Sequence, residues 1–584
     1  MLSRYQGDAI GIFHPETPTA HASTEYFDIV NGTHTHPLDS LIEGARNHLD
    51  SLLLKRSEDV ASAAKRYRER RGRHPPPGFD KWAEYAIKHK AIIVEDFFDR
   101  VYKDIAPFWA IDPTKIARQA TSYPWVVRTR KGETTGVGNT EGRVPWLQLW
   151  TELVEEAGPY LPDVDMPTNM MDESRLLVPW EEINKMITVE TKGRTMPLPS
   201  DVVREYSGLQ HIEGMDKMAE PKWIHDLNKY WDYARACCAP HAPSRNLPAL
   251  EDPSLPPQFP FADADYSWKG YIKNFTAAID PCQQPHIRAF HATFIEPVSM
   301  QTATELVPLF GGSKLPMNNE ILIPGAMYIT KDAFYSGGET HGPPWEKKKA
   351  GIVWRGVASG GRNKPNNWMH FQRHRLIEML NGTTVSRLER NDARAMTFEL
   401  PPVEKYDFPR RREGKVGEWL TKAADAAFVN LFCADGNCDY VSPYFSVKES
   451  VPMADQYQQK FMPDADGNSF SARFRGLLLS TSLPLKATIY AEWHDDRLIP
   501  WRHFVPLDNT FQDMYGVLDF FTRDTKGDAA AKMIAETGKQ WGEQVLRRED
   551  MVLYTWRVLL EFARVCDVNR DKLGYVDDLL STQV

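Results

Sequence analysis

The chain has 584 residues, of which 42% are hydrophobic, and its formal net charge is −9. This length predicts two or three packed globular units. A nucleic-acid binder would carry a basic excess, so the acidic balance argues against that class of protein. The sequence contains no run of about 18 apolar residues, so no membrane span is predicted. Its start, Met1 to Tyr5, lacks the pattern of a signal peptide.

The N-terminal part predicts a helical arm. Apolar residues recur at helical spacing through residues 37–72, which end in a basic cluster, Arg66 to Arg71. The cluster is interpreted as a solvated face of the helix. The segment Arg73 to Gly78 contains three prolines in a row and is predicted to be a hinge, and a second Pro-rich stretch, Pro240 to Pro260, is predicted to be an exposed connection.

Short apolar runs then alternate with turns and are typical of an α/β layer. We expect strands at Ala292–Ile295, Leu306–Phe310 and Ile321–Pro324. From residue 350 the pattern predicts a strand, a helix over 368–380, a helix over 416–428, a cysteine-containing loop, a helix over 470–480 and a strand over 483–490. A helical tail follows, with an apolar face between Met551 and Phe562.

A glycine-rich turn is the most informative motif. The strand-like run Gly351 to Trp354 leads into Arg355-Gly-Val-Ala-Ser359-Gly360-Gly361-Arg362-Asn363. Backbone N–H groups of such a loop, together with guanidinium groups, match the oxygens of a diphosphate. The alternative is an ordinary strand-to-helix connection in which both arginines are solvated.

The run from Asp464 to Arg475 is the second motif. It is not a calcium loop, because Gly467 stands fourth rather than sixth and Arg475 occupies the place of the bidentate glutamate. We expect Ser469 or Ser471 to cap a helix and Arg473 to reach from its first turn. Glu492 would follow the next strand, at the edge where open α/β sheets bind ligands, and would accept hydrogen bonds from ribose hydroxyls.

Other enzyme signatures are lacking. Gly311-Gly312-Ser313-Lys314 does not have the spacing of a phosphate-binding P-loop, and neither a G-x-S-x-G nor an H-E-x-x-H motif occurs.

Six cysteines and three N-glycosylation sequons bear on the compartment. Cys433 and Cys438 are spaced for a tight disulfide loop, and Cys282 could pair with Cys237 or Cys238; buried reduced thiols are the alternative. The sequons begin at Asn31, Asn274 and Asn381. Together they favour a lumenal protein whose membrane anchor is absent from this sequence.

Three windows occur together in one known family. They are Trp354 to Arg362, Asp466 to Arg475, and Glu492-Trp-His-Asp-Asp-Arg-Leu-Ile-Pro-Trp501-Arg-His-Phe-Val-Pro506. Residues 290–520 resemble glycosyltransferase family 90, which groups capsule-associated xylosyltransferases with Rumi-type protein O-glucosyltransferases. The segment Arg70 to Trp82 resembles the fungal-type branch.

The resemblance implies an α/β, GT-B-like fold with two Rossmann-like lobes and a cleft between them. We expect a mostly helical N-terminal arm at 1–75, an acceptor-side lobe at 76–345 and a donor-binding lobe at 346–535. C-terminal helices at 536–584 would pack back on the first lobe.

The same resemblance assigns roles to individual residues. Arg355, Ser359 and Arg362 match the loop that faces the donor diphosphate, and Glu492 matches an acidic residue beside the nucleotide. The second donor motif corresponds to Ser469, Phe470, Ser471 and Arg473. Relatives carry an aspartate as catalytic base where this chain has Glu296, so Glu296 is the candidate base and Glu320 the competing carboxylate.

The expected activity is inverting transfer of xylose or glucose from a UDP-sugar to a hydroxyl of a glycan, polysaccharide or glycoprotein. The alternative is a catalytically silent relative that binds nucleotide or glycan. No tightly bound cofactor, resident metal or nucleic-acid partner is expected, and the resemblance implies the lumen of the Golgi or ER.

Overall fold

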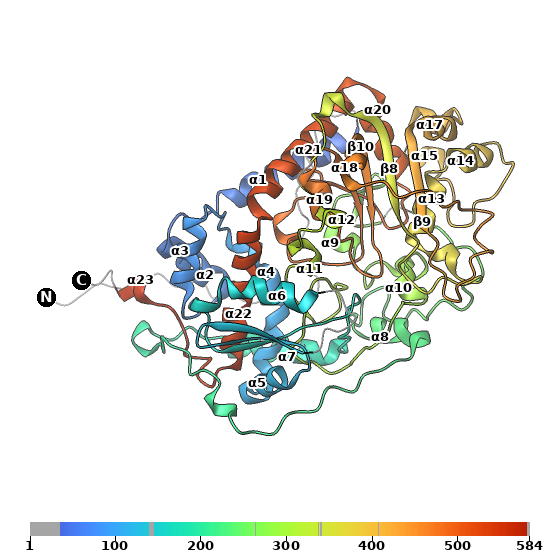
Figure 1. The fold of residues 1–584 in the computed structure, drawn as a ribbon. Coiled ribbons are helices and arrows are strands. Elements are labelled where there is room, and N and C mark those ends of the chain that lie inside the picture. Colours follow the sequence, from blue (N-terminus) through green and yellow to red (C-terminus); the bar gives the residue numbers. More distant parts are fainter. Residues whose placement is uncertain are drawn as a thin grey trace.

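A parallel sheet organises the second half of the chain in this computed structural model (Figure 1). The structure describes residues 36–138, 145–262, 264–336, 338, 341–406 and 408–580. The sheet has five strands in the order β12-β11-β10-β8-β9, and each neighbouring pair is parallel. Its strands are β8 (Lys349–Val357), β9 (Ala424–Asn430), β10 (Gln459–Ala465), β11 (Leu483–Ala487) and β12 (Val505–Pro506).

Helices connect and cover these strands. Strand β11 contacts α19 and α21, whereas α13 contacts β9 and β10. Strands β10 and β11 are buried along most of their length, as expected for a parallel sheet covered on both faces. The helices of this part are α13 (Gln372–Met379), α14 (Gly382–Glu389), α15 (Val403–Tyr406), α16 (Pro409–Arg412), α17 (Val416–Ala423), α18 (Met453–Gln456), α19 (Phe474–Leu479), α20 (Met514–Arg523) and α21 (Thr525–Val545).

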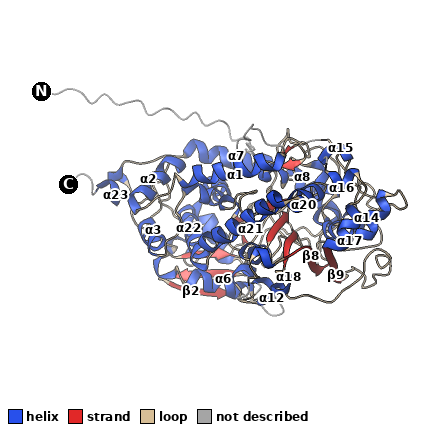
Figure 2. Cartoon of the chain, turned by 90° about the horizontal axis from the view of Figure 1, so that it is seen from above, coloured by secondary structure: helices blue, strands red, loops and turns tan. Residues whose placement is uncertain are grey.

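The first half of the chain is built around a different sheet. Three antiparallel strands have the order β2-β1-β3, and the parallel pair β6-β7 adjoins them through a bridge between Thr168 and Phe310. Figures 1 and 2 show this sheet and the parallel sheet toward opposite ends of the molecule. The strands are β1 (Val126–Arg130), β2 (Glu133–Val137), β3 (Val164–Pro167), β4 (Ser267–Trp268), β5 (Tyr271–Ile272), β6 (Phe310–Gly311) and β7 (Ile321–Leu322).

Helices α5 (Pro113–Ser122) and α6 (Trp146–Glu155) pack against the antiparallel strands. The other helices of the first half are α1 (Pro37–Leu53), α2 (Val60–Arg71), α3 (Phe79–Lys88), α4 (Asp99–Ile105), α7 (Trp180–Gly193), α8 (Tyr230–Ala236), α9 (Phe275–Ala278), α10 (Ala292–Ile295), α11 (Ala326–Ile329) and α12 (Ala333–Ser336).

Two predicted elements are corrected. Residues 292–295 form the short helix α10 rather than a strand, with the His291 imidazole accepting a hydrogen bond from the Thr293 N–H. The predicted helix over 416–428 stops at Ala423, and β9 begins at the next residue. The segment is rich in alanine, which favours helix locally, but parallel pairing with Ile352 to Val357 overrides that preference.

The N-terminal region is helical through α1 and α2, as predicted, but its basic cluster is not a solvated face and the prolines after it do not form a hinge. Arg68 pairs with Asp578 at 2.6 Å, and Arg71 pairs with Glu95 at 2.8 Å, so much of the basic cluster is neutralised by carboxylates. Pro75 to Pro77 are buried, and the Pro75 carbonyl accepts a hydrogen bond from the Tyr575 N–H at 2.7 Å. Local sequence could not reveal these contacts, because several partners lie about 500 positions away.

The helix α22 (Arg548–Cys566) packs against elements from the first part of the described chain. Nearly all of its residues are buried, and it contacts α3, α4, α5, α6 and β3. Arg557 is fully buried and pairs with Glu95 at 3.1 Å. The short helix α23 (Asp577–Leu580) follows it. The last helices therefore pack on the first part of the chain (Figure 1, red).

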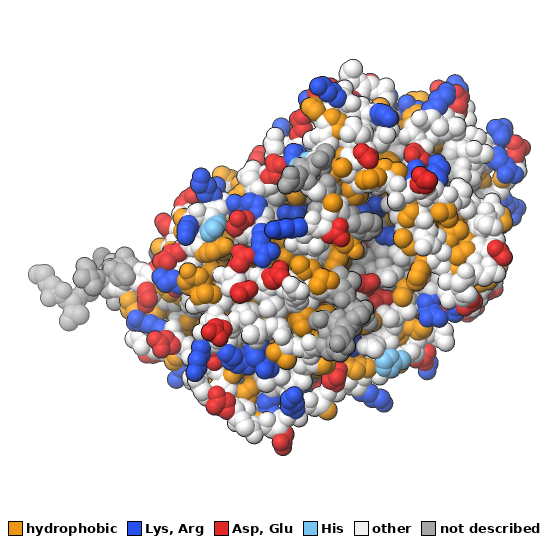
Figure 3. All heavy atoms as spheres, in the orientation of Figure 1, with side chains coloured by type: hydrophobic (Ala, Val, Ile, Leu, Met, Phe, Trp, Pro, Cys, Tyr) orange, Lys and Arg blue, Asp and Glu red, His pale blue; other side chains and the backbone are white. Residues whose placement is uncertain are grey.

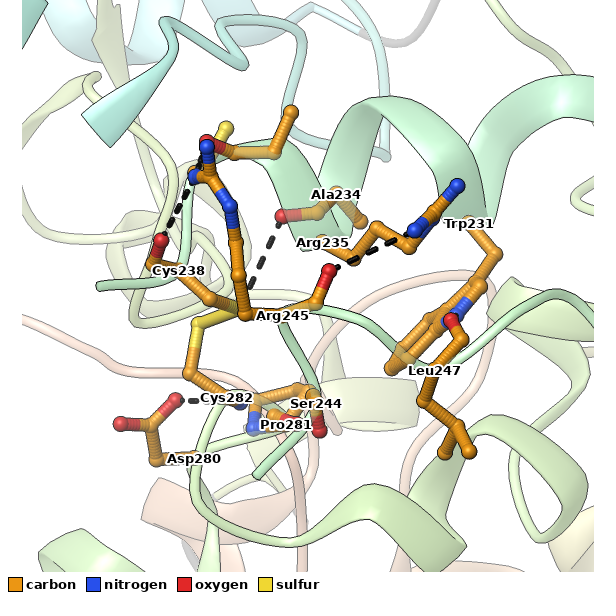
Figure 4. The surroundings of a disulfide bond; sticks show 12 residues. Trp231, Ala234, Arg235, Cys238, Ser244, Arg245, Leu247, Asp280, Pro281 and Cys282 are labelled. Carbon is orange, nitrogen blue, oxygen red and sulfur yellow. Dashed lines mark hydrogen bonds between the residues drawn. A yellow bond between two sulfur atoms is a disulfide. The ribbon is translucent and has the colours of Figure 1, made fainter. Parts of the chain in front are cut away.

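Two disulfides are present. Cys433 is bonded to Cys438, as predicted, and Cys282 pairs with Cys238, which leaves Cys237 as a buried free thiol. Around the second bond, shown in Figure 4, the Ser244 hydroxyl donates to the Pro281 carbonyl at 2.6 Å.

The surface carries no large field of one charge on the face shown in Figure 3, where acidic and basic side chains are intermingled. Within the described ranges, no helix combines the length and the apolar character needed to cross a bilayer.

Helix α21 approaches the sheet at Gly538, and this contact generates a stability prediction. A Cβ atom at Gly538 would lie 2.1 Å from the His503 carbonyl oxygen, closer than real contacts allow. We expect Gly538→Ala to cost about 1–3 kcal/mol of stability through overpacking, measured as a fall in the thermal unfolding midpoint.

Gly193 is the matched control, because it also lies in a helix but a Cβ atom there would have no other atom within 4 Å. Gly193→Ala should change stability by no more than about 0.5 kcal/mol. An unaltered midpoint for Gly538→Ala would contradict the tight approach of α21.

Candidate functional site

A cavity of about 650 Å³ opens where the two halves of the chain meet. One wall comes from the ends of β8 and β10 and the loops that follow them. The other wall comes from helices α6, α11 and α12. Its lining residues are Trp146, Trp150, Asn169, Met171, Asp172, Gly312, Ser313, Gly325, Ala326, Met327, Ala333, Tyr335, Arg355, Gly356, Val357, Ser359, Arg373, Val429, Ser450, Val451, Pro452, Met453, Gln456, Asn468, Ser469, Phe470, Ser471, Ala472 and Arg473.

Three arginines lie in this lining, each held by a different element. Arg355 is near the carboxyl end of β8, Arg373 is in the first turn of α13, and Arg473 immediately precedes α19. The Arg473 guanidinium donates to the Arg355 carbonyl oxygen at 2.7 Å. Parallel pairing of β8 with β10 brings these residues together, since the carboxyl ends of parallel strands share one edge of a sheet.

The arginines differ in how well their charge is balanced. Arg355 has a carboxylate partner, Asp425, at 2.7 Å. Arg373 donates instead to the Ser359 hydroxyl at 2.7 Å and to the Asp466 carbonyl oxygen at 2.9 Å, which are neutral acceptors. Burial, reinforced by the nearby charge of Arg473, lowers the pKa of Arg373 to about 10.

The charge of Arg473 is also poorly balanced. Its nearest carboxylate, on Asp464, is 4.0 Å away. Burial raises the pKa of Asp464, which weakens its value as a counterion, and burial lowers the pKa of Arg473. A bound anion would relieve this excess of positive charge, so the wall suits a phosphate or diphosphate group.

The predicted donor-motif residues Ser359, Ser469, Phe470 and Ser471 also line the cavity. Their loops are tied together by a hydrogen bond from the Gly360 N–H to the Asn468 side-chain oxygen at 3.0 Å. The expected helix cap is absent. Residue Arg473 occupies the N-cap position of α19 without a side-chain cap bond, and the Ser471 hydroxyl donates to Asp464 instead.

Arg362 and Glu296 do not belong to the lining. They form an ion pair with each other at 3.3 Å, and Lys364 approaches Glu296 at 2.7 Å. The Arg362 side chain is 42% exposed. The turn at Gly361 directs this part of the loop away from the cavity, and a Cβ there would lie 2.7 Å from the Glu296 carbonyl oxygen.

Glu320 is also outside the cavity lining. It is fully buried and accepts hydrogen bonds from the backbone N–H groups of Arg175 and Leu176, the latter at 3.0 Å. Burial raises its pKa. These contacts give Glu320 the geometry of a structural carboxylate that fixes the segment after β3.

Glu492 lies behind the cavity wall, where its side chain is fully buried and outside the lining. It accepts from Lys486 at 2.8 Å and from the Tyr328 hydroxyl at 2.6 Å, and His494 lies 3.3 Å away. Burial opposes its ionisation, but Lys486 and His494 outweigh burial and lower the pKa of Glu492 to about 2.

The Glu492 cluster nevertheless reaches the site through α11. Tyr328 belongs to this helix, and its neighbours Ala326 and Met327 line the cavity. The Tyr328 and Phe470 rings are 5.4 Å apart. Glu492 therefore anchors, from behind, the helix that faces the donor motif.

Sequence reasoning missed several lining residues. Asp172 is an exposed carboxylate in the cavity, and its side chain accepts a hydrogen bond from Asn468 at 3.3 Å. Trp146 and Trp150 stand one turn apart on α6, with ring centres 6.2 Å apart. Asp172 could have been found from its position five residues after the buried strand β3. Sequence reasoning did not predict that strand.

Metal ligands are not gathered in the described part of the chain, where no group of three or more His, Cys, Asp or Glu side chains is arranged to hold an ion.

Comparison with known proteins shows that residues 410–577 match the family described as Glycosyl transferase family 90. Similar curated proteins include "O-glucosyltransferase rumi" of Drosophila pseudoobscura pseudoobscura, 35% identical over 116 residues, or 19% of this chain and 27% of that protein. "Protein O-glucosyltransferase 3" of Rattus norvegicus is 30% identical over 110 residues, or 19% and 21%. "Protein O-glucosyltransferase 1" of Homo sapiens is 26% identical over 133 residues, or 23% and 33%.

These alignments cover a third or less of each relative. The family region contains the second donor motif, Ser469 to Arg473, together with Glu492, whereas the glycine-rich loop lies upstream of it. The match thus covers part of one wall of the cavity and part of the Glu492 cluster behind it. Residues 410–577 are thus similar to glycosyl transferase family 90.

Proposed function

We propose that this protein is an inverting glycosyltransferase that moves a sugar from a UDP-sugar to a hydroxyl of a glycan or glycoprotein. The observation that carries the proposal is the convergence of Arg355, Arg373 and Arg473 on one cavity at the carboxyl end of a parallel sheet. The relatives are named O-glucosyltransferases, so glucose is the first sugar to test, and xylose is the second.

The arginine wall is proposed to bind the diphosphate of the donor. As the bond between the sugar carbon and the phosphate oxygen breaks, negative charge grows on the departing UDP. Fixed guanidinium groups stabilise that charge without having to reorganise. Ser359, Ser469, Phe470 and Ser471 border the same space and would position the donor.

Asp172 is proposed as the catalytic base. Inversion requires an acceptor hydroxyl to attack the sugar carbon from the face opposite the leaving UDP, and a carboxylate must take the hydroxyl proton. Asp172 is the exposed acidic side chain among the lining residues. Glu296, the base expected from the family resemblance, is the alternative, although it is paired with Arg362 and Lys364.

The two halves of the chain are proposed to act as the lobes of a GT-B-like enzyme. Residues 346–535 would hold the donor and residues 76–345 the acceptor. The two disulfides support an oxidising compartment such as the secretory lumen, because such bonds are rare in cytosolic proteins.

The first prediction from the proposed function concerns donor binding. Arg473→Ala and Arg373→Ala should each weaken the binding of UDP by about 1.5–3 kcal/mol, because each removes a charge-assisted hydrogen-bond donor to the diphosphate. Isothermal titration calorimetry with UDP measures the change.

Arg362→Ala is the matched control, since it removes the same charge from the same region but outside the lining. Its affinity for UDP should stay close to that of the wild type. If Arg362→Ala weakens UDP binding more than the two cavity variants do, the diphosphate lies in a different place.

The second prediction concerns the base. Asp172→Asn should lower kcat by roughly 10²- to 10⁴-fold, because the amide cannot accept the proton, while UDP affinity stays unchanged. UDP release with UDP-glucose or UDP-xylose and a panel of glycan acceptors provides the rate.

Glu296→Gln and Glu320→Gln complete the series. Retained turnover in both supports Asp172 as the base, whereas loss of turnover confined to Glu296→Gln assigns the role to Glu296. UDP binding without turnover on any acceptor in the wild type would favour a nucleotide- or glycan-binding protein that has lost transfer.

A further inference from the structure

The three glycosylation sequons differ in how the folded chain presents them. Asn31 lies outside the described residues. The side chain of Asn274 caps α9, with its oxygen accepting from the Ala277 N–H at 3.1 Å, and the residue is only 2% exposed. An oligosaccharide on Asn274 would need a path through packed protein, so a modified Asn274 is incompatible with this fold.

Asn381 is presented in the opposite way. It is exposed, and so is Thr383, the hydroxyl residue of its sequon. Its side-chain oxygen accepts hydrogen bonds from the N–H groups of Thr383 at 3.1 Å and Thr384 at 3.2 Å, which makes Asn381 the N-cap of α14. The described residues provide no hydrogen-bond partner for its Nδ2 atom.

The Nδ2 atom of Asn381 can therefore be modified while its side-chain oxygen continues to cap α14. N-glycosylation replaces one hydrogen on Nδ2 and keeps the amide oxygen, which is the atom that holds the first turn of α14. The buried side of the turn is at Gly382, where a Cβ would lie 2.4 Å from the Thr421 backbone nitrogen on α17. The Asn381 side faces solvent.

The position of α14 makes the attachment harmless to the candidate site. Figures 1 and 2 both show this helix at the outer edge of the molecule, beside α17. No residue of α14 lines the cavity. The disulfides Cys238–Cys282 and Cys433–Cys438 are compatible with the oxidising compartment in which N-glycans are added.

We propose that Asn381 is an N-glycosylation site of the folded protein and that Asn274 remains unmodified. The donor is a lipid-linked diphospho-oligosaccharide, and the transferase of the secretory pathway supplies the catalysis. A bond forms between Nδ2 and the sugar C1, the bond from C1 to the diphosphate oxygen breaks, the lipid diphosphate leaves with the electron pair, and Nδ2 loses a proton.

The test is site-by-site mapping of the full chain, fused to a secretion signal and expressed in eukaryotic cells. Monomeric protein is isolated by size-exclusion chromatography, reduced, treated with peptide N-glycosidase in ¹⁸O water and digested with trypsin. The sequons then fall in separate peptides, 5–46, 274–288 and 376–387. We expect ¹⁸O-labelled aspartate at 381 in most copies and unlabelled asparagine at 274.

Variants at Thr383 test the sequon while the Asn381 side chain, which caps α14, stays in place. Thr383→Ala removes the sequon but keeps Asn381 and the backbone N–H groups that it caps, whereas Thr383→Ser keeps both. Label at 381 should disappear in Thr383→Ala and persist in Thr383→Ser, with both proteins monomeric. Unlabelled asparagine at 381 in wild-type monomer, or label at 274 in that monomer, overturns the proposal.

Discussion

Parallel pairing of β8 with β10 is the constraint on which the candidate site depends. Both strands end at the same edge of the sheet, so the loop after β8 and the loop after β10 must face each other there. Two hydrogen bonds fix this arrangement: the Arg473 side chain donates to the Arg355 carbonyl, and the Gly360 N–H donates to Asn468. Residues 100 or more positions apart are thereby joined in one wall.

The wall gathers positive charge that the protein itself does not fully neutralise. Arg355 has a carboxylate partner, but Arg373 binds neutral acceptors and Arg473 has a carboxylate only at 4.0 Å. Holding guanidinium groups in this state costs free energy, since burial disfavours charge. Such an arrangement is typical of a site whose counterion is a ligand rather than part of the chain.

The buried carboxylates of this region bind protein groups and hold the structure in place, whereas the arginines are available to a ligand. Glu320 fixes the backbone at Arg175 and Leu176, and Glu492 holds Tyr328 and Lys486 behind the cavity wall. Their oxygens are committed to protein donors. Asp172 differs because it is exposed in the cavity, although its side chain also accepts a hydrogen bond from Asn468 at 3.3 Å. Exposure to the cavity therefore distinguishes Asp172 from the two buried, structural carboxylates.

Sequence alone indicated the α/β class, the glycine-rich loop after β8, the second donor motif and the Cys433–Cys438 loop, because each depends on neighbouring residues. It did not locate the strand β9, the carboxylate partners of the basic N-terminal cluster or the cavity position of Asp172. Those features depend on distant partners: β9 on pairing with β8, Arg68 on Asp578, and Asp172 on Asn468. The sequence predicted the same role, diphosphate binding, for Arg355, Arg362 and Arg473. In the tertiary structure Arg355 and Arg473 line the cavity, whereas Arg362 pairs with Glu296. The direction of a side chain is set by packing and charge across the whole fold, which local spacing does not encode.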